Sequence, residues 1–135
     1  MAQDANLTLQ TSVTKTATFN GAGVSLPGGT PTRGLFAHVL YSAATNASGS
    51  NSVLFQIDVS PDGGSTWYDA EFAAEDQVIT LSTTAQSGEI IIPFNTNTPT
   101  LLAGSAPEVR LTCTVSGAGS TPTVTYSGAI ELGLN

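Results

Sequence analysis

Three carboxylates flank one short turn in the sequence, and they are the residues best placed for metal chemistry. Asp58, Asp62 and Asp69 lie within twelve residues of one another, on either side of Gly63-Gly64. Carboxylate oxygens are the ligands that Ca²⁺ prefers. The spacing differs from that of an EF-hand loop, however, and Asp58 is expected to project from a strand. We therefore expect no metal and no other cofactor.

A single histidine and a single cysteine are the remaining candidates for catalysis. His38 lies in an apolar run, which favours a core or interface residue over a general base. Cys113 alternates with Leu111 and Val115, which is typical of a small buried side chain, and one cysteine cannot form an internal disulfide. The many Ser and Thr residues show no triad or nucleophile elbow. The sequence predicts that the protein is not an enzyme.

The turn itself, Ser60-Pro-Asp-Gly-Gly-Ser-Thr-Trp67, resembles an Asp box, a hairpin motif of sialidase-type propellers that also occurs singly in other β proteins. The resemblance implies a structural role, in which Asp62 locks the turn and Trp67 packs beneath it. Gly63 and Gly64 tolerate positive φ, as such a turn requires. One copy in a chain too short for a propeller gives no reason to expect sialidase activity.

The chain around this turn has the period of two that is typical of β-strands. Val53, Phe55, Ile57 and Val59 share one face of a strand and should lie in the core. Further strands are expected at residues 6–20, 34–43, 77–82, 89–94, 108–116 and 121–134, with turns between them, one of them at Ser87-Gly88. About eight strands and no helix predict an all-β fold, a two-layer antiparallel β-sandwich that is jelly-roll-like. An immunoglobulin-like sandwich is the alternative, weakened by the missing cysteine pair.

The length of 135 residues suits one domain with a substantial core. We expect a flexible N-terminal arm at residues 1–6, followed by a single β-sandwich domain at residues 7–135. Such an arm is suited to extending the sheet of a neighbouring subunit by strand addition.

The charge of the chain is unusual for a folded domain. Only 10% of residues are charged, against about 25% in ordinary domains, and the formal net charge is −7. Three basic residues do not make a nucleic-acid surface, so no nucleic-acid partner is expected. No apolar run is long enough for a membrane span and no secretion signal is evident, so no membrane partner is expected. A weakly charged surface favours burial against other subunits, although a monomer with a polar β surface is the alternative.

Most of the chain, from Leu7 to Leu134, resembles the small capsid cement (decoration) proteins of tailed bacteriophages, particularly the Bordetella-phage-type cement family. The resemblance is carried by the MAQDANLTL start, the IDVSPDGG hairpin at residues 57–64, the IIIPF strand at residues 90–94 and VRLTCTVSG at residues 109–117. It implies a homo-oligomer, dimer or trimer, on the capsid exterior of a virion assembled in the host cytoplasm. Its partner would be the major capsid protein.

A subunit interface of this kind needs an arm and apolar anchors. The residues expected to supply them are Gln3, Asp4, Ala5, Asn6, Phe36, Leu40 and Phe94. The alternative function is that of a carbohydrate- or receptor-binding module of a phage tail fibre or spike. In that case Trp67, Tyr68 and Tyr41 would form an aromatic platform for sugar.

Overall fold

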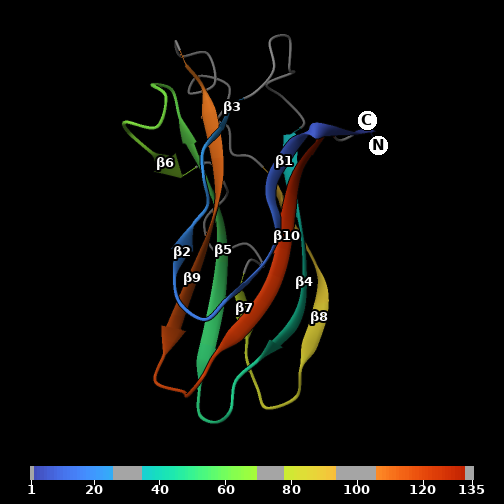
Figure 1. Cartoon of the computed structure of the whole chain (residues 1–135), viewed down its shortest axis with the longest axis vertical. Coiled ribbons are helices and arrows are strands. Elements are labelled where there is room, and N and C mark those ends of the chain that lie inside the picture. The colour runs from blue at the N-terminus through green and yellow to red at the C-terminus, as the bar shows by residue number, and fades with distance from the viewer. Residues whose placement is uncertain (1, 26–34, 70–77, 94–105, 133–135) are drawn as a thin grey trace.

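The computed structural model describes residues 2–25, 35–69, 78–93 and 106–132, which form ten β-strands and no helix (Figure 1). One sheet has four strands, in the order β1 (Ala2–Lys15), β10 (Thr123–Leu132), β4 (Leu35–Thr45) and β8 (Gln86–Pro93). The other has six: β2 (Phe19–Asn20), β9 (Glu108–Gly117), β5 (Asn51–Ser60) and β6 (Tyr68–Asp69), with β3 (Val24–Ser25) paired to β9 and β7 (Val78–Thr80) paired to β5. All these strand pairs are antiparallel.

The two sheets pack face to face, which confirms the predicted all-β sandwich (Figure 1). The strands beyond the expected eight are short, since β2 and β3 have two residues each. In the part of the chain that the structure describes, no helix has the length and apolar character needed to cross a membrane.

The core lies between the sheets and follows the alternation of the sequence. Along β5, the four residues at positions 53, 55, 57 and 59 are fully buried, while the residues between them are partly exposed. They meet side chains of the opposite sheet, among them Val39 of β4 and Ile130 of β10, which are also fully buried. Each large apolar side chain buried in this way contributes roughly 1.5–3 kcal/mol. The strict alternation of β5 is therefore enforced by the core on one side.

Strand β4 explains why one predicted strand is apolar on both faces. It lies between β10 and β8 in the four-stranded sheet. Ala37 and Val39 point into the core and are fully buried. By the period of two, Phe36, His38 and Leu40 lie on the outer face of the sheet. Phe36 and Leu40 are therefore apolar side chains of β4 that lie outside the core.

The N-terminal residues differ from the expectation of a free arm. Strand β1 begins at Ala2, where the chain pairs with Leu132, and Gln3 pairs with Glu131. Ala2 and Gln3 are thus paired with β10 in the chain's own sheet, and residues 4–6 lie in β1 within the register shift between Gln3 and Thr8. The start of β1 therefore extends the sheet of its own chain, whereas the expected arm would extend the sheet of a neighbouring subunit.

A turn was also wrongly expected at Ser87-Gly88, since both residues lie inside β8. Gly88 pairs with Tyr41 of β4, and a Cβ at position 88 would lie 2.8 Å from the Tyr41 hydroxyl. The glycine therefore makes room for a tyrosine on the neighbouring strand. A glycine in a strand can mark such a close approach as well as a turn.

Candidate functional site

The Asp62 turn is closed by hydrogen bonds to the side chains of Ser60 and Asp62. The Ser60 hydroxyl donates to Asp62 Oδ1 over 2.7 Å, and the Thr66 amide donates to the same oxygen over 2.9 Å. The Gly64 amide donates to Ser60 Oγ over 2.8 Å. These donors stabilise the charged carboxylate, so the hydrogen bonds from Ser60 and Thr66 lower the pKa of Asp62. Gly63 and Gly64 both have positive φ, at 75° and 96°.

Trp67 is held under an arginine beside this turn. The Arg110 guanidinium lies over its ring, 4.3 Å from the centroid, and Arg110 also binds Asp58 through Nε and Nη2, both 3.1 Å from Oδ2. Asp58 is therefore the ion-pair partner of Arg110 within the six-stranded sheet. Among the described residues no group of three or more His, Cys, Asp or Glu side chains is arranged to hold a metal ion. The contacts around the Asp62 turn thus include hydrogen bonds, an ion pair and a cation–π contact within the six-stranded sheet.

The three aromatic residues considered for sugar binding lie on different sheets. Tyr68 begins β6 of the six-stranded sheet and Trp67 directly precedes it, whereas Tyr41 belongs to β4 in the other sheet. The Tyr41 ring is partly buried against the core, and one face of Trp67 is covered by Arg110. The structure does not bring these rings together as a platform.

The outer face of the four-stranded sheet carries a cluster that we call the outer patch. It is defined by Phe36, His38 and Leu40 of β4, Glu89 and Ile91 of β8, and Glu131 of β10. Leu40 is 51% exposed and Ile91 is 53% exposed, and they rank among the most exposed large apolar residues of the described chain. In the register of β4 and β8, Leu40 lies opposite Glu89 and His38 opposite Ile91. Leu40 and Ile91 are therefore diagonal neighbours, close enough for one partner group to cover both.

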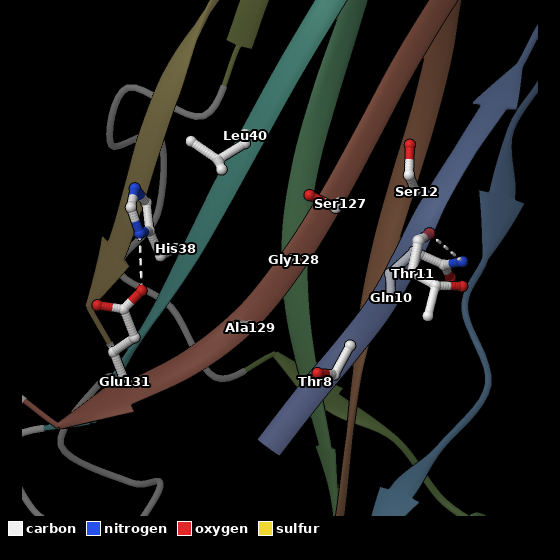
Figure 2. A pocket seen from close by; sticks show the side chains of 10 residues that line it. All are labelled: Thr8, Gln10, Thr11, Ser12, His38, Leu40, Ser127, Gly128, Ala129 and Glu131. Carbon is white, nitrogen blue, oxygen red and sulfur yellow. Dashed lines mark hydrogen bonds and ion pairs between the residues drawn. The ribbon is translucent and has the colours of Figure 1, made fainter. Parts of the chain in front are cut away.

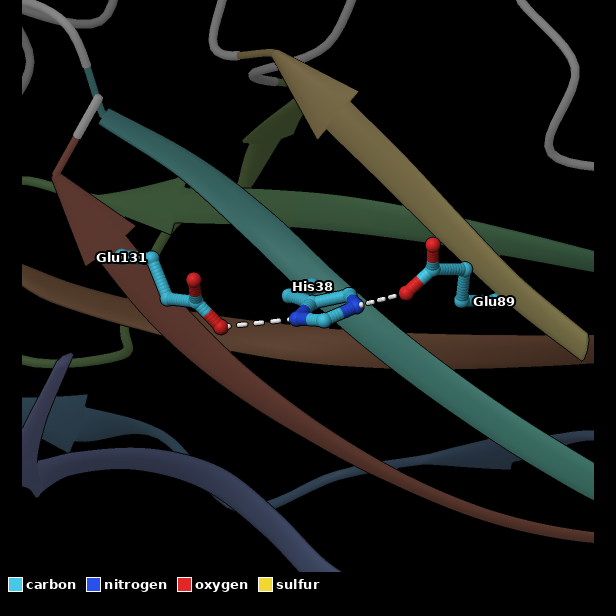
Figure 3. Close-up of polar contacts among 3 residues, drawn as sticks. All are labelled: His38, Glu89 and Glu131. Carbon is cyan, nitrogen blue, oxygen red and sulfur yellow. Dashed lines mark hydrogen bonds and ion pairs between the residues drawn. The ribbon is translucent and has the colours of Figure 1, made fainter. Parts of the chain in front are cut away.

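His38 bridges two carboxylates in the middle of this patch (Figure 3). Its Nδ1 lies 2.7 Å from Glu131 Oε2, and its Nε2 lies 2.7 Å from Glu89 Oε2. The Glu131 side chain is only 5% exposed, whereas the Glu89 side chain is 62% exposed. Burial lowers the pKa of His38, but the hydrogen bonds and charges of the two carboxylates raise it by more, so the pKa lies above its ordinary value. The charged imidazolium is the form that satisfies both carboxylates.

A groove of about 630 Å³ runs beside the bridge, over β10 (Figure 2). Its floor is made of the small residues Ser127, Gly128 and Ala129. One wall is β4, with His38 and Leu40; the other is β1, which contributes Thr8, Gln10, Thr11 and Ser12. The register of β1 against β10 shifts three times between Gln3 and Val13, which marks bulges or irregularities in the wall. The groove therefore combines hydroxyl and amide groups on one side with an apolar side chain on the other.

The residues predicted for an interface are only partly placed by the structure. Phe36 and Leu40 both belong to the outer patch, Phe36 being partly buried and Leu40 exposed. The segment from Gln3 to Asn6 is in β1, and Phe94 lies outside the described residues.

Sequence reasoning missed the carboxylate bridge and the groove. The expectation that His38 is a core or interface residue gave no hint of its two acidic partners. They are 51 and 93 residues away in the chain, so that only the strand register places them beside it. A His and a Glu on the outward positions of two predicted strands were the only available signal. No family model, curated protein or solved structure matches this chain.

Proposed function

We propose that this protein is a structural module of a virion, a cement or decoration protein that binds the exterior of a tailed-bacteriophage capsid and holds major capsid subunits together. The observation that carries the proposal is the outer patch, where Leu40 and Ile91 are exposed on the outer face of the four-stranded sheet. Exposed apolar neighbours on a sheet face are typical of a protein contact surface. The sequence resemblance to phage cement proteins supplies the class of partner.

The strand orders β1-β10-β4-β8 and β2-β9-β5-β6 support a finer description of the fold. Each sheet has one late strand inserted between two earlier ones: β10 lies between β1 and β4, and β9 lies between β2 and β5. Two nested Greek keys would place the strands in this way. We infer a jelly roll, an architecture common in viral capsid proteins. This inference fits the proposed place of the protein in a virion.

The proposed mechanism is mass action. A protein that binds assembled shells but not free capsid subunits adds its binding free energy to the stability of the shell. The ten acidic and three basic residues of the chain suit an exterior position, away from packaged nucleic acid. Self-association into a dimer or trimer would let one oligomer of this protein contact several capsid subunits at once, which would increase its avidity for the shell.

The test uses purified protein, empty phage shells and dissociated capsid subunits, compared by size-exclusion chromatography with light scattering. We expect saturable binding to shells, none to dissociated subunits, and a raised melting temperature of the shell. Replacing both Leu40 and Ile91 by Ser should weaken shell binding at least about tenfold, since two apolar contacts are lost. Val78→Ser is the matched control, because Val78 is 54% exposed but belongs to β7 of the opposite sheet. Absence of shell binding, or equal loss in the control, would contradict the proposal.

A carbohydrate- or receptor-binding module of a tail fibre or spike is the second candidate, and the groove over β10 is the observation that favours it. Thr8, Gln10, Ser12 and Ser127 offer hydroxyl and amide groups of the kind that bind sugar hydroxyls. A glycan array distinguishes the two functions. Binding that is lost on Ser127→Val but kept on Trp67→Ala would favour the groove as the sugar site.

A further inference from the structure

The carboxylate bridge joins three adjacent strands through one ring. His38 projects from β4, Glu131 from β10 on one side and Glu89 from β8 on the other (Figure 3). Among the described strands, β8 has β4 as its one neighbour and forms an edge of the sheet. The contact between His38 and Glu89 is therefore a side-chain link that holds an edge strand to the sheet interior.

Proton counting limits what this bridge can do. The imidazolium has two N–H groups, so it can donate to both carboxylates at once. The neutral ring has one N–H group and one nitrogen lone pair, and the lone pair faces the carboxylate that receives no hydrogen bond. Loss of one proton must therefore abolish one of the two hydrogen bonds, and the remaining proton sits on either Nδ1 or Nε2.

The unequal burial of the two carboxylates decides between these tautomers. The Glu131 side chain is 5% exposed, so it would be left desolvated and without its imidazole donor if Nδ1 gave up the proton. The Glu89 side chain is 62% exposed, and water can replace the donor that it loses. The other residues that line the groove come from β1, β4 and β10 and are uncharged, so among the described side chains Glu89 and Glu131 are the titratable groups that face the ring.

We propose that His38 is a proton-dependent clasp on the edge strand β8: when it loses a proton it keeps the Nδ1–H tautomer, retains Glu131 of β10 and releases Glu89 of β8. The clasp is closed at acidic pH and open at alkaline pH. Its opening changes the formal charge of the bridge from −1 to −2, next to Leu40, which lies opposite Glu89. This inference concerns the protein alone and does not depend on the proposed partner.

The experiment is a pH titration of the whole protein with ¹⁵N-labelled histidine, followed by long-range ¹H–¹⁵N correlation spectra. His38 is the only histidine of the chain, so both ring-nitrogen signals belong to it, and their different couplings to Hδ2 and Hε1 distinguish Nε2 from Nδ1. At low pH we expect both nitrogens to have shifts of protonated nitrogen. At high pH Nδ1 should keep that shift while Nε2 moves to the range of an unprotonated ring nitrogen.

Two variants separate the clasp from a general effect of charge. Glu89→Gln should lower the pH of half-titration and leave the Nδ1–H tautomer unchanged, because Glu131 still determines the tautomer. Glu108→Gln removes one negative charge from β9 in the other sheet and should leave both observations as in the wild type. An Nε2–H tautomer at high pH, or a half-titration point that does not respond to Glu89→Gln, would overturn the proposal.

Discussion

The ring of Phe55 meets the ring of Tyr126 edge to face, with centroids 4.9 Å apart and planes inclined by 65°. Phe55 comes from β5 and Tyr126 from β10, so this pair joins the two sheets at the centre of the sandwich. Both side chains are almost completely buried. An aromatic pair of this geometry is worth about 0.5–1.5 kcal/mol beyond the area that it buries.

The hydroxyl of Tyr126 makes the first prediction possible. It is buried beside Cys113 and has no hydrogen-bond partner of regular geometry among the described residues, and burial first and Cys113 second raise its pKa. Tyr126→Phe removes a desolvated polar atom and keeps the ring, so the free energy of unfolding should stay within about 1 kcal/mol of the wild type or rise. Tyr126→Ala should lower it by about 3–5 kcal/mol. Urea unfolding measures both, and a large loss in Tyr126→Phe would reveal a hidden partner of the hydroxyl.

Gly117 and Gly63 form a matched pair for a second prediction. Both have positive φ, 104° and 75° respectively, but a Cβ at Gly117 would collide with the Ser50 carbonyl oxygen, whereas one at Gly63 would lie 3.6 Å from Ala106 Cβ. Gly63→Ala should therefore cost only the backbone strain, about 1–2 kcal/mol. Gly117→Ala should cost clearly more. Equal melting temperatures of the two variants would contradict this steric argument.

Cys113 should be protected from thiol reagents in the folded protein. Burial raises its pKa from 9.0 to about 11, so the thiolate fraction at pH 8 falls about 100-fold even before access is considered. Reaction with Ellman's reagent at pH 8 should accordingly be at least about 100-fold slower in buffer than in denaturant. Rapid labelling of the native protein, with unchanged circular dichroism, would show that the strand around Cys113 opens readily.

The stability of the protein should depend on pH through His38. The pKa of His38 in the folded protein is raised above its ordinary value of about 6.5, so the stabilisation is fully present below about pH 6.5 and is lost as the pH rises through the folded pKa. The free energy of unfolding should fall over this window, by about 1 kcal/mol or less because Glu89 is exposed.

His38→Gln is the control for that dependence, because it removes the titrating group. The α-amino group titrates in the same region in both proteins, so the difference between the two curves isolates the histidine. Chemical unfolding at intervals from pH 5 to pH 9 gives the two curves. A difference that is constant across the range would exclude a stabilising imidazolium.

The long strands were predictable because the core imposes a period of two on them. The residues of β5, β9 and β10 that face the other sheet are apolar and those between them are mostly polar, so the sequence alone located these strands. The strands β2 and β3 have two residues each, which is too short to show a period. The turn predicted at Gly88 was wrong because this glycine makes room for the side chain of Tyr41, a residue 47 positions away in the chain.

The site was predictable only in part, for a related reason. The hydrogen bonds of the Asp62 turn are local, and a motif of eight residues is enough to suggest them. The bridge of His38 to Glu89 and Glu131 depends on the register of two strand pairs, and a shift by one residue would place the carboxylates on the other face. Leu40 was singled out from an apolar run, but its exposure follows from its face of β4.

The positions of β9 and β10 in the two sheets set the order in which the protein can be built. Each is an interior strand, β9 between β2 and β5, and β10 between β1 and β4, although both come last in the chain. During translation, the N-terminal strands emerge from the ribosome long before their partners exist. The six-stranded sheet cannot be completed before β9 has been synthesised, and the four-stranded sheet cannot be completed before β10. Pairings of this range fold slowly. Until then, the strands that will flank β9 and β10 have exposed edges, and the nascent chain is most prone to aggregation in that interval.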